Sequence, residues 1–180
     1  MSGDMKIVVI SGSPRKNALT QVAMKYVYEY TKSKNQDTKL INLSDGQIEC
    51  YRGPEEEYNE ATMTAANDIM EADIWLIGTP IYNSFFSSAL KNLFEYINYK
   101  KTPGKIAGMT ILAAGNIGFI DVQTLITQLL SYFGVITNPK AVFLTTESVS
   151  ENSITDKDTK KRLKEMTDET LEIASKLHQN

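Results

Sequence analysis

Short apolar runs alternate along this chain with longer segments in which apolar residues recur every three or four positions. The first run, residues 5–10, is largely β-branched and ends at small polar residues, which is typical of a strand buried on both faces of a parallel sheet. In the next segment Leu19, Val22 and Tyr26 lie at helical spacing between polar residues, which indicates an amphipathic helix. Continued to the C-terminus, the pattern predicts strands at residues 5–10, 38–43, 73–78, 105–113 and 141–145, and helices at residues 17–33, 61–72, 87–99, 120–133 and 156–177.

Regular alternation of strands and helices predicts a three-layer α/β fold, because right-handed crossovers place helices on both faces of a parallel sheet. Five parallel strands of this kind most often take the order 2-1-3-4-5, the flavodoxin-like doubly wound sheet. The chain has 180 residues, close to the length of one domain, and shows neither a repeat nor a linker. We therefore expect a single domain over residues 1–180.

The composition removes several classes of chemistry. The chain holds one Cys and one His, Cys50 and His178, whereas a zinc site needs about four Cys, His or carboxylate ligands and a Ser-His or Cys-His pair needs a placed His. We expect no metal site and no catalytic side chain of its own. The formal net charge of -3 disfavours nucleic acid and membrane surfaces as partners, because both favour a basic face.

The location of the protein is predicted from what its sequence lacks. A lone cysteine forms no intrachain disulfide, which fits a reducing compartment. The apolar run at residues 7–10 is too short for the core of a signal peptide, and the two long uncharged stretches, residues 74–90 and 106–120, are broken by polar residues and glycines. We expect a cytoplasmic protein without a membrane span.

In an open parallel sheet, ligands bind outside the carboxyl ends of the strands, so the loops after the strands hold the candidate site residues. The first loop, residues 11–20, reads Ser-Gly-Ser-Pro-Arg-Lys-Asn-Ala-Leu-Thr. Its small residues and the helix that follows suit an anion, its hydroxyl and amide side chains add donors, and Arg15 suits a phosphate. The alternative is a Ser13-Pro14 turn that only caps the helix, which would not require Arg15 and Lys16 beside so many hydroxyls. We favour phosphate binding, although the loop matches neither the nucleoside-triphosphate nor the dinucleotide glycine motif.

Two further loops complete the predicted binding edge. Residues 78–84 read Gly-Thr-Pro-Ile-Tyr-Asn-Ser, and six aromatic residues lie between Tyr82 and Tyr99, where they could stack on a flat ligand or cover a core or subunit interface. We favour ligand contact for Tyr82 and Asn83, and core or interface packing for Phe94 and Tyr96. Gly115 and Gly118 after the fourth strand permit close approach to a ligand, or simply a turn into a helix. Residues 74–120 contain one acid, Glu95, against four lysines, which suits an anionic cofactor.

Three motifs occur in a fixed order along the chain: Gly12-Ser-Pro-Arg15, Thr79-Pro-Ile-Tyr-Asn83 with Ser88-Ala-Leu-Lys-Asn92, and Gly104-Lys105 opening a strand that ends at Ala114-Gly-Asn116. Together they resemble the NADPH-dependent FMN reductase family of flavodoxin-like proteins. The resemblance spans about residues 6–145. Within the family, the second loop is most similar to that of FMN reductases that feed sulfonate monooxygenases, and more distantly to azoreductases and quinone reductases.

The resemblance implies an FMN-dependent oxidoreductase that takes hydride from NADPH or NADH and passes electrons to free flavin, a quinone, or an azo or nitro compound. It implies a cofactor site in three parts. Ser11, Ser13, Arg15, Asn17, Ala18, Leu19 and Thr20 would surround the FMN phosphate; Pro80, Ile81, Tyr82, Asn83 and Ser84 would lie along the isoalloxazine and ribityl chain; Gly115, Asn116, Ile117 and Gly118 would meet the far edge of the ring.

The chain departs from the family at several positions. Many members have Ser at position 18, Glu at position 81 and Gly at position 84, where this chain has Ala18, Ile81 and Ser84. Sulfonate-type reductases carry an inserted Tyr in the helix after the fourth strand, linked to a flavin that leaves as a substrate. Residues 117–131 contain no Tyr, which favours tightly held FMN.

Two further expectations concern the alternative function and the assembly. The alternative is a flavodoxin-like electron carrier or regulator without NAD(P)H turnover, but such proteins usually have a Thr-rich phosphate loop without Arg and a strongly acidic surface. We also expect a homodimer or homotetramer, with the aromatic helix at residues 87–99 near the interface so that a second subunit helps to cover the flavin.

Overall fold

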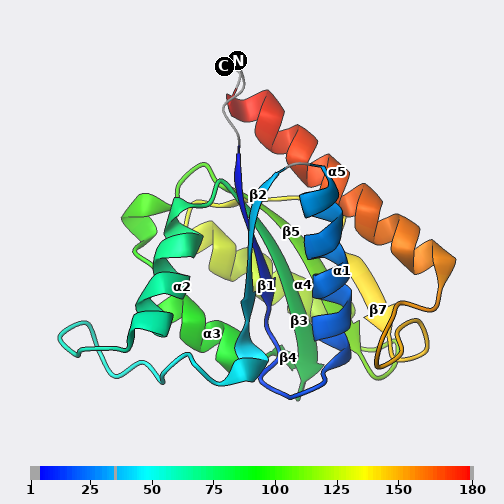
Figure 1. The fold of residues 1–180 in the computed structure, drawn as a ribbon, viewed down its shortest axis with the longest axis horizontal. Coiled ribbons are helices and arrows are strands. Elements are labelled where there is room, and N and C mark those ends of the chain that lie inside the picture. The colour runs from blue at the N-terminus through cyan, green and yellow to red at the C-terminus, as the bar shows by residue number, and fades with distance from the viewer. Residues whose placement is uncertain (1–4, 35, 179–180) are drawn as a thin grey trace.

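The structure is a computed structural model that describes residues 5–34 and 36–178, and it shows a sheet between two layers of helices (Figure 1). The strands are β1 Lys6–Ser11, β2 Asp37–Asn42, β3 Ile74–Tyr82, β4 Phe85–Phe86, β5 Ile106–Ala113, β6 Ile136–Thr137 and β7 Val142–Thr145. The helices are α1 Leu19–Ser33, α2 Glu60–Glu71, α3 Ser88–Glu95, α4 Phe119–Tyr132 and α5 Lys157–His178, with short 3-10 turns η1 Leu43–Asp45 and η2 Tyr99–Lys101. Each of the predicted strands and helices has a counterpart in this order.

The sheet confirms the predicted fold class. Strands run in the order β2-β1-β3-β5, and both β6 and β7 pair in parallel with the far side of β5. The five predicted strands thus lie in the order 2-1-3-4-5, with β6 as an additional short strand beside the fourth. In the register of the central strands, Ile7 lies opposite Thr38 of β2 and Ile74 of β3.

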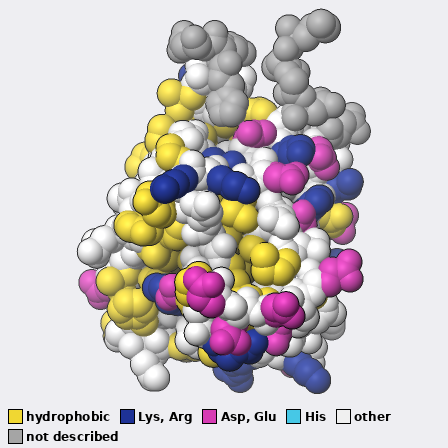
Figure 2. Space-filling model, turned by 90° about the vertical axis from the view of Figure 1, so that its left-hand side faces the viewer, with side chains coloured by type: hydrophobic (Ala, Val, Ile, Leu, Met, Phe, Trp, Pro, Cys, Tyr) yellow, Lys and Arg dark blue, Asp and Glu magenta, His cyan; other side chains and the backbone are white. Residues whose placement is uncertain are grey.

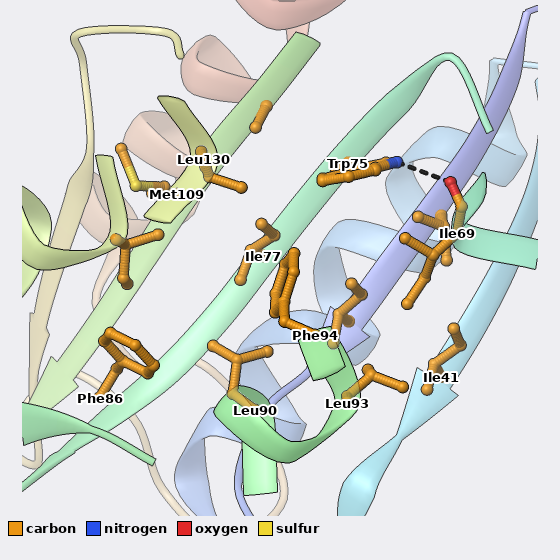
Figure 3. Close-up of a cluster of buried hydrophobic side chains, with 14 of the residues drawn as sticks. Ile41, Ile69, Trp75, Ile77, Phe86, Leu90, Leu93, Phe94, Met109 and Leu130 are labelled. Carbon is orange, nitrogen blue, oxygen red and sulfur yellow. Dashed lines mark hydrogen bonds between the residues drawn. The ribbon is translucent and has the colours of Figure 1, made fainter. Parts of the chain in front are cut away.

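The two faces of the sheet carry separate hydrophobic cores because side chains alternate along each strand. Ile74 and Leu76 of β3 pack with α1 and α5, whereas Trp75 and Ile77 pack with α2, α3 and α4. Figure 3 shows the second core, where the indole of Trp75 lies 5.8 Å from the ring of Phe94 and donates a 2.9 Å hydrogen bond to the carbonyl of Ile69. The strands are therefore apolar on both faces, which is why they appear in the sequence as continuous apolar runs.

The segment between the strand predicted at residues 73–78 and the helix predicted at residues 87–99 was expected to be a loop; it is instead a β-hairpin, and that prediction is wrong. Strand β3 continues to Tyr82 and turns back into the antiparallel β4. Asn83 and Ser84 form the turn with φ values of 48° and 63°, the left-handed pair that two-residue hairpins favour because it matches the twist of the strands. The sequence pattern missed the hairpin because Asn-Ser is a weaker turn signal than Asn-Gly and because β4 has only two residues.

The helix predicted at residues 87–99 is shorter than expected. It splits into α3 and η2, and the side chain of Asn98 caps the second piece by accepting a 3.0 Å hydrogen bond from the amide of Lys100. Phe94 is buried in the core, and Tyr96 packs edge-on against Tyr51 and Tyr58, so these two rings are structural as favoured above. The outward-facing residues of this helix are polar.

The acidic loop at residues 46–59 is fastened to α3. Asn92 accepts a hydrogen bond from the amide of Tyr51 (2.8 Å) and donates one to the carbonyl of Glu49 (2.7 Å), which also accepts from the hydroxyl of Tyr96 (2.8 Å). Burial raises the pKa of Tyr96 to about 12, so this hydroxyl stays protonated and can donate at neutral pH. Acidic side chains are scattered over both the upper and the lower part of the face that Figure 2 shows, with basic side chains among them.

Among the helices that the structure describes, none is both long and apolar enough to cross a membrane.

Candidate cofactor site

A cavity of about 400 Å³ lies at the carboxyl end of the sheet, where the loop after β1 meets the end of β3. It is lined by Arg15, Lys16, Asn17, Ala18, Leu19, Thr20, Pro80, Ile81, Tyr82, Leu112, Ala114 and Thr146. This is the edge of the sheet at which the strand order reverses around β1 and β3, and open α/β sheets bind ligands there.

The loop after β1 is held against β3 by close backbone contact. Gly12 donates a 2.8 Å hydrogen bond from its amide to the carbonyl of Gly78, and a Cβ atom at Gly12 would lie 2.6 Å from that oxygen. Ser87 extends the contact to α3, because its hydroxyl donates to the carbonyl of Gly12 and its amide donates to the hydroxyl of Thr79 at 3.2 Å. The loop, the hairpin and α3 therefore form one connected wall of the site.

The N-terminus of α1 opens into the cavity without a side-chain cap. Ala18 occupies the N-cap position with extended backbone, and its methyl side chain cannot accept a hydrogen bond from the first turn, which also contains no acidic residue. Its carbonyl accepts one from the amide of Gln21 (2.9 Å), so the earlier amides of the turn are the ones left for a ligand. Thr20 in that turn is 1% exposed, and its hydroxyl oxygen has no hydrogen-bond partner among the described residues. Amide groups at a helix N-terminus together with an unpartnered hydroxyl fit an anionic ligand.

Charge and loop geometry favour the same kind of ligand. Arg15 and Lys16 line the cavity and form no ion pair with any part of the chain that the structure describes, and no carboxylate lines it. The hydroxyl of Ser13 accepts a 3.3 Å hydrogen bond from the amide of Arg15 and lies 3.0 Å from the hydroxyl of Tyr82. Ser13 thus ties the basic end of the loop to the ring of Tyr82 on the opposite wall.

The structure brings the first two groups of predicted site residues together in part. The lining includes Arg15, Asn17, Ala18, Leu19, Thr20, Pro80, Ile81 and Tyr82. Ser13 is buried next to the cavity, and its hydroxyl contacts that of Tyr82. Ser11 is also buried but does not line the cavity, and its hydroxyl has no hydrogen-bond partner among the residues described. Asn83 and Ser84 form the exposed hairpin turn beyond it.

The third predicted group, residues 115–118, lies beside the cavity and does not line it. Gly115, Asn116 and Ile117 are exposed, and Gly118 lies close enough to β3 that a Cβ atom there would be 3.6 Å from the Cδ1 atom of Ile81. Position 118 therefore adjoins the ring-binding side of the predicted site through Ile81.

Sequence reasoning missed four lining residues: Lys16, Leu112, Ala114 and Thr146. The sequence places Lys16 beside Arg15, but Lys16 is not among the predicted site residues. Leu112 and Ala114 lie at the carboxyl end of the fourth predicted strand, where a ligand-facing position could have been inferred. Thr146 follows β7, and nothing in the sequence places the loop after the last strand at the cavity.

Comparison with known proteins decides the family. Residues 5–149 match the family of NADPH-dependent FMN reductases. The chain belongs to this family. The match covers β1 to β7 and therefore the whole lining of the cavity.

The chain is also similar to individual curated proteins and shares its fold with a solved structure. The chain is 32% identical over 143 residues to an NADPH azoreductase of Bacillus sp., covering 78% of this chain and 76% of that protein. It is 27% identical over 139 residues to an NAD(P)H-dependent FAD/FMN reductase of Geobacillus thermodenitrificans, covering 76% and 75%. The fold is that of the flavoenzyme NAD(P)H:(acceptor) oxidoreductase FerB from Paracoccus denitrificans, with a TM-score of 0.77 at 23% identity and coverage of 96% and 98%.

The site fits the cofactor that the family implies. FMN carries a terminal phosphate, and the uncapped start of α1, the unpartnered hydroxyl of Thr20 and the cations Arg15 and Lys16 provide the donors and charge that a phosphate requires. As a member of this family, the chain is an FMN-dependent NAD(P)H oxidoreductase.

Proposed function

We propose that the cavity at the carboxyl end of the sheet holds FMN with its phosphate at the start of α1 and its ring toward the β3–β4 hairpin. Arg15, Asn17 and Thr20 would bind the phosphate, with the amides of the first helical turn. The observation that carries this orientation is the unpartnered hydroxyl of Thr20 beside an uncapped helix, because both need an acceptor that the described residues do not supply. Pro80 to Tyr82 line the opposite wall, and Asn83, Ser84 and residues 115–118 would border the ring.

The chain's own residues bind and orient, and we assign none of them a covalent step. FMN, when bound, supplies the hydride-accepting and electron-donating chemistry. Ile81 and Leu112 give the cavity apolar walls that exclude water, and Ser13 fixes the side chain of Tyr82. This division explains how a chain with one Cys and one His serves as an enzyme.

The electron acceptor is proposed to be a small aromatic compound, such as free flavin, a quinone, or an azo or nitro compound. Three exposed apolar side chains, Phe85, Ile117 and Ile120, lie on the β3–β4 hairpin and at the start of α4, two elements that lie close together. Exposed apolar side chains near the cavity would favour contact with an aromatic ring. The activities named for the relatives, azo reduction in Bacillus sp. and FAD/FMN reduction in Geobacillus thermodenitrificans, are of this kind.

We further propose that the chain forms a single domain, works in the cytoplasm, and assembles as a homodimer or homotetramer that holds FMN tightly. The exposed, unpaired thiol of Cys50 suits a reducing compartment. Because the outer face of α3 is polar, the interface is better placed on the apolar surface of Phe85, Ile117 and Ile120 than on the helix first expected. A second subunit there would help to cover the flavin.

The function is tested by the visible spectrum of the purified protein before and after anaerobic addition of NADPH or NADH. We expect a yellow protein whose flavin absorbance bleaches with either donor. A protein that binds FMN but stays yellow after the donor is added is an electron carrier. A protein that binds no FMN is neither an FMN-dependent oxidoreductase nor an FMN-binding electron carrier. Riboflavin, which lacks the phosphate, serves as the matched ligand control and should bind much more weakly than FMN.

A further inference from the structure

A cavity of about 380 Å³ lies between the edge strand β2 and helix α2; we call it the β2 groove. Strand β2 is the end strand of the sheet, and within the described residues it pairs with β1 alone. One side of its backbone therefore keeps N–H and C=O groups without a strand partner, and such an edge can accept an extended peptide as an added strand. The opposite edge is covered in part, because Arg162 of α5 donates a 3.1 Å hydrogen bond to the carbonyl of Phe143 in β7. The β2 groove thus lies beside the open edge of the sheet.

The floor of the β2 groove is apolar and preformed. Its apolar lining residues are Leu40, Ile41, Ile48, Ala61 and Ala65. Leu40 is 38% exposed, while Ile48 is half-buried. The side chain of Asn59 holds the two walls together, because it donates a 3.0 Å hydrogen bond to the carbonyl of Gln47 and accepts a 2.8 Å hydrogen bond from the amide of Thr62 in α2. A floor of this kind gives an apolar side chain of an added strand a place to pack.

The rim of the β2 groove is acidic and carries no basic side chain. Asp45, Glu60 and Asp68 line it. Asp68 is paired with Lys39, whereas Asp45 and Glu60 belong to no ion pair within residues 5–34 and 36–178. Residues 40–90 contain nine acidic residues and one basic residue, although the whole chain has a formal net charge of only -3. In Figure 1 the acidic loop between β2 and α2 extends away from the sheet, so this negative charge is open to a partner.

Charge decides between the possible occupants of the β2 groove. A second copy of this chain, paired edge to edge about a two-fold axis, would bring the carboxylates of both rims together, and like charges repel. A metal ion needs several ligands in one place, and the described residues include no group of three or more Asp, Glu, His or Cys side chains that could hold one. An extended chain with positive side chains fits both the open backbone edge and the unpaired carboxylates.

We propose that the β2 groove binds an extended basic segment of a partner protein, which adds to the edge of β2 as a further strand. Lysine or arginine side chains of the segment lie against Asp45 and Glu60, and an apolar side chain between them packs on Leu40 and Ile48. The groove shares no lining residue with the cofactor cavity. The proposal therefore goes beyond the proposed oxidoreductase function and does not depend on it.

Isothermal titration of synthetic peptides into the full chain at low salt tests the β2 groove. The probe is a heptapeptide of alternating lysine and valine with lysine at both ends, and we expect it to bind with an affinity that falls as salt is added. Two control peptides separate the contributions: alternating glutamate and valine keeps the strand propensity and reverses the charge, and alternating lysine and glycine keeps the charge without the apolar side chains. Neither control should bind as the probe does. A probe that does not bind, or a lysine–glycine peptide that binds equally well, would overturn the proposal.

Two variants and one further measurement place the peptide. Glu60→Lys should weaken the lysine–valine peptide about tenfold, because it turns an attraction at the rim into a repulsion. Glu151→Lys is the matched control, because it makes the same charge change at an exposed position outside the groove and should leave binding unchanged. Hydrogen exchange at the amides of residues 37–42 should slow when the peptide is bound, as an added strand requires. Equal weakening in both variants, or unchanged exchange in β2, would overturn the proposal, whereas a protein without reductase activity would overturn only the proposed function.

Discussion

At the scale of single residues, Thr20 shows how the site is prepared for a ligand. Its hydroxyl oxygen is buried beside the cofactor cavity and has no hydrogen-bond partner among the residues described. A buried unpartnered hydroxyl costs about 1–3 kcal/mol, so the folded protein without ligand carries this cost. A bound phosphate would remove it by accepting the hydrogen bond.

Thr20→Val replaces this hydroxyl with a methyl group of similar size and should change stability and binding in opposite directions. We expect the free energy of unfolding without FMN to stay equal or rise, while FMN affinity falls by about 1.5–3 kcal/mol, or tenfold to over a hundredfold. Thermal unfolding and a fluorescence titration with FMN measure the two effects.

Thr110→Val is the matched control, because Thr110 also buries an unpartnered hydroxyl but lies within β5 and does not line the cavity. It should leave FMN affinity unchanged. Equal FMN affinity in the Thr20 variant and the parent would show that this hydroxyl does not contact the cofactor.

Arg15 supplies the charge of the phosphate loop. Its guanidinium is exposed at the cavity and forms no ion pair within the described parts of the chain, so it is available to a ligand. Arg15→Ala should weaken FMN by about 1.5–3 kcal/mol, the range for a charge-assisted hydrogen bond, in an equilibrium titration. Arg52→Ala, on the acidic loop, removes the same charge far from the lining and should bind FMN like the parent; an unchanged affinity for Arg15→Ala would remove Arg15 from the site.

At the scale of elements, the site depends on how closely the first loop approaches β3. Gly12 has no side chain, so its amide reaches the carbonyl of Gly78, and Ser87 then binds both Gly12 and Thr79. These contacts set the distance between the phosphate loop and the hairpin that carries Tyr82. The phosphate loop and the ring-binding wall are therefore built as one unit.

Gly12→Ala should disrupt the close contact between the phosphate loop and β3. The added Cβ would lie 2.6 Å from a backbone oxygen, and forcing extra atoms into packed structure costs about 1–3 kcal/mol, so we expect a lower melting temperature and weaker FMN binding. Gly115→Ala is the control for the melting temperature alone, because no atom lies within 4 Å of a Cβ built there and its φ is not left-handed, whereas residues 115–118 are proposed to border the ring. A Gly12 variant as stable as the parent would show that the loop can move away from β3 at little cost.

The elements differ in how far the sequence predicts them. Long strands such as β5 and long helices such as α1 were predicted because burial on one or both faces leaves a periodic pattern. The hairpin was not, because β4 has two residues and its pairing with Ile81 and Tyr82 is a contact between backbones. The end of α3 was missed for a related reason, since Tyr96 and Ile97 continue the helical spacing although the chain has already left the helix.

At the scale of the whole molecule, three strongly exposed apolar residues lie on the elements next to the site. Phe85 is 47%, Ile120 65% and Ile117 86% exposed. Exposed apolar clusters commonly mark interaction sites, because burying them removes apolar surface from water. This surface borders the cavity through Ile81, so a second subunit bound there would also shield the cofactor.

The 20.1 kDa chain should therefore sediment as a dimer or tetramer at micromolar concentration. Ile117→Lys, which places a charge at the most exposed of these apolar residues, should shift the distribution toward monomer. Met63→Lys changes an apolar residue on α2 that is 43% exposed, and should leave the assembly intact. A monomeric parent protein would contradict the assembly, and an Ile117→Lys protein that sediments like the parent would place the interface elsewhere.

The sequence by itself determined the layers of the fold, the strand order and the presence of a phosphate site, and its resemblance to a family implied FMN. The first three follow from local information: burial periodicity identifies the elements, right-handed crossovers limit their arrangement, and the Ser-Arg-Asn loop before a helix marks a phosphate site. Only the tertiary structure decided that Thr146 lines the cavity and that Ser87 joins three elements. Such contacts join residues far apart in the chain, and they depend on packing distances that no local pattern encodes.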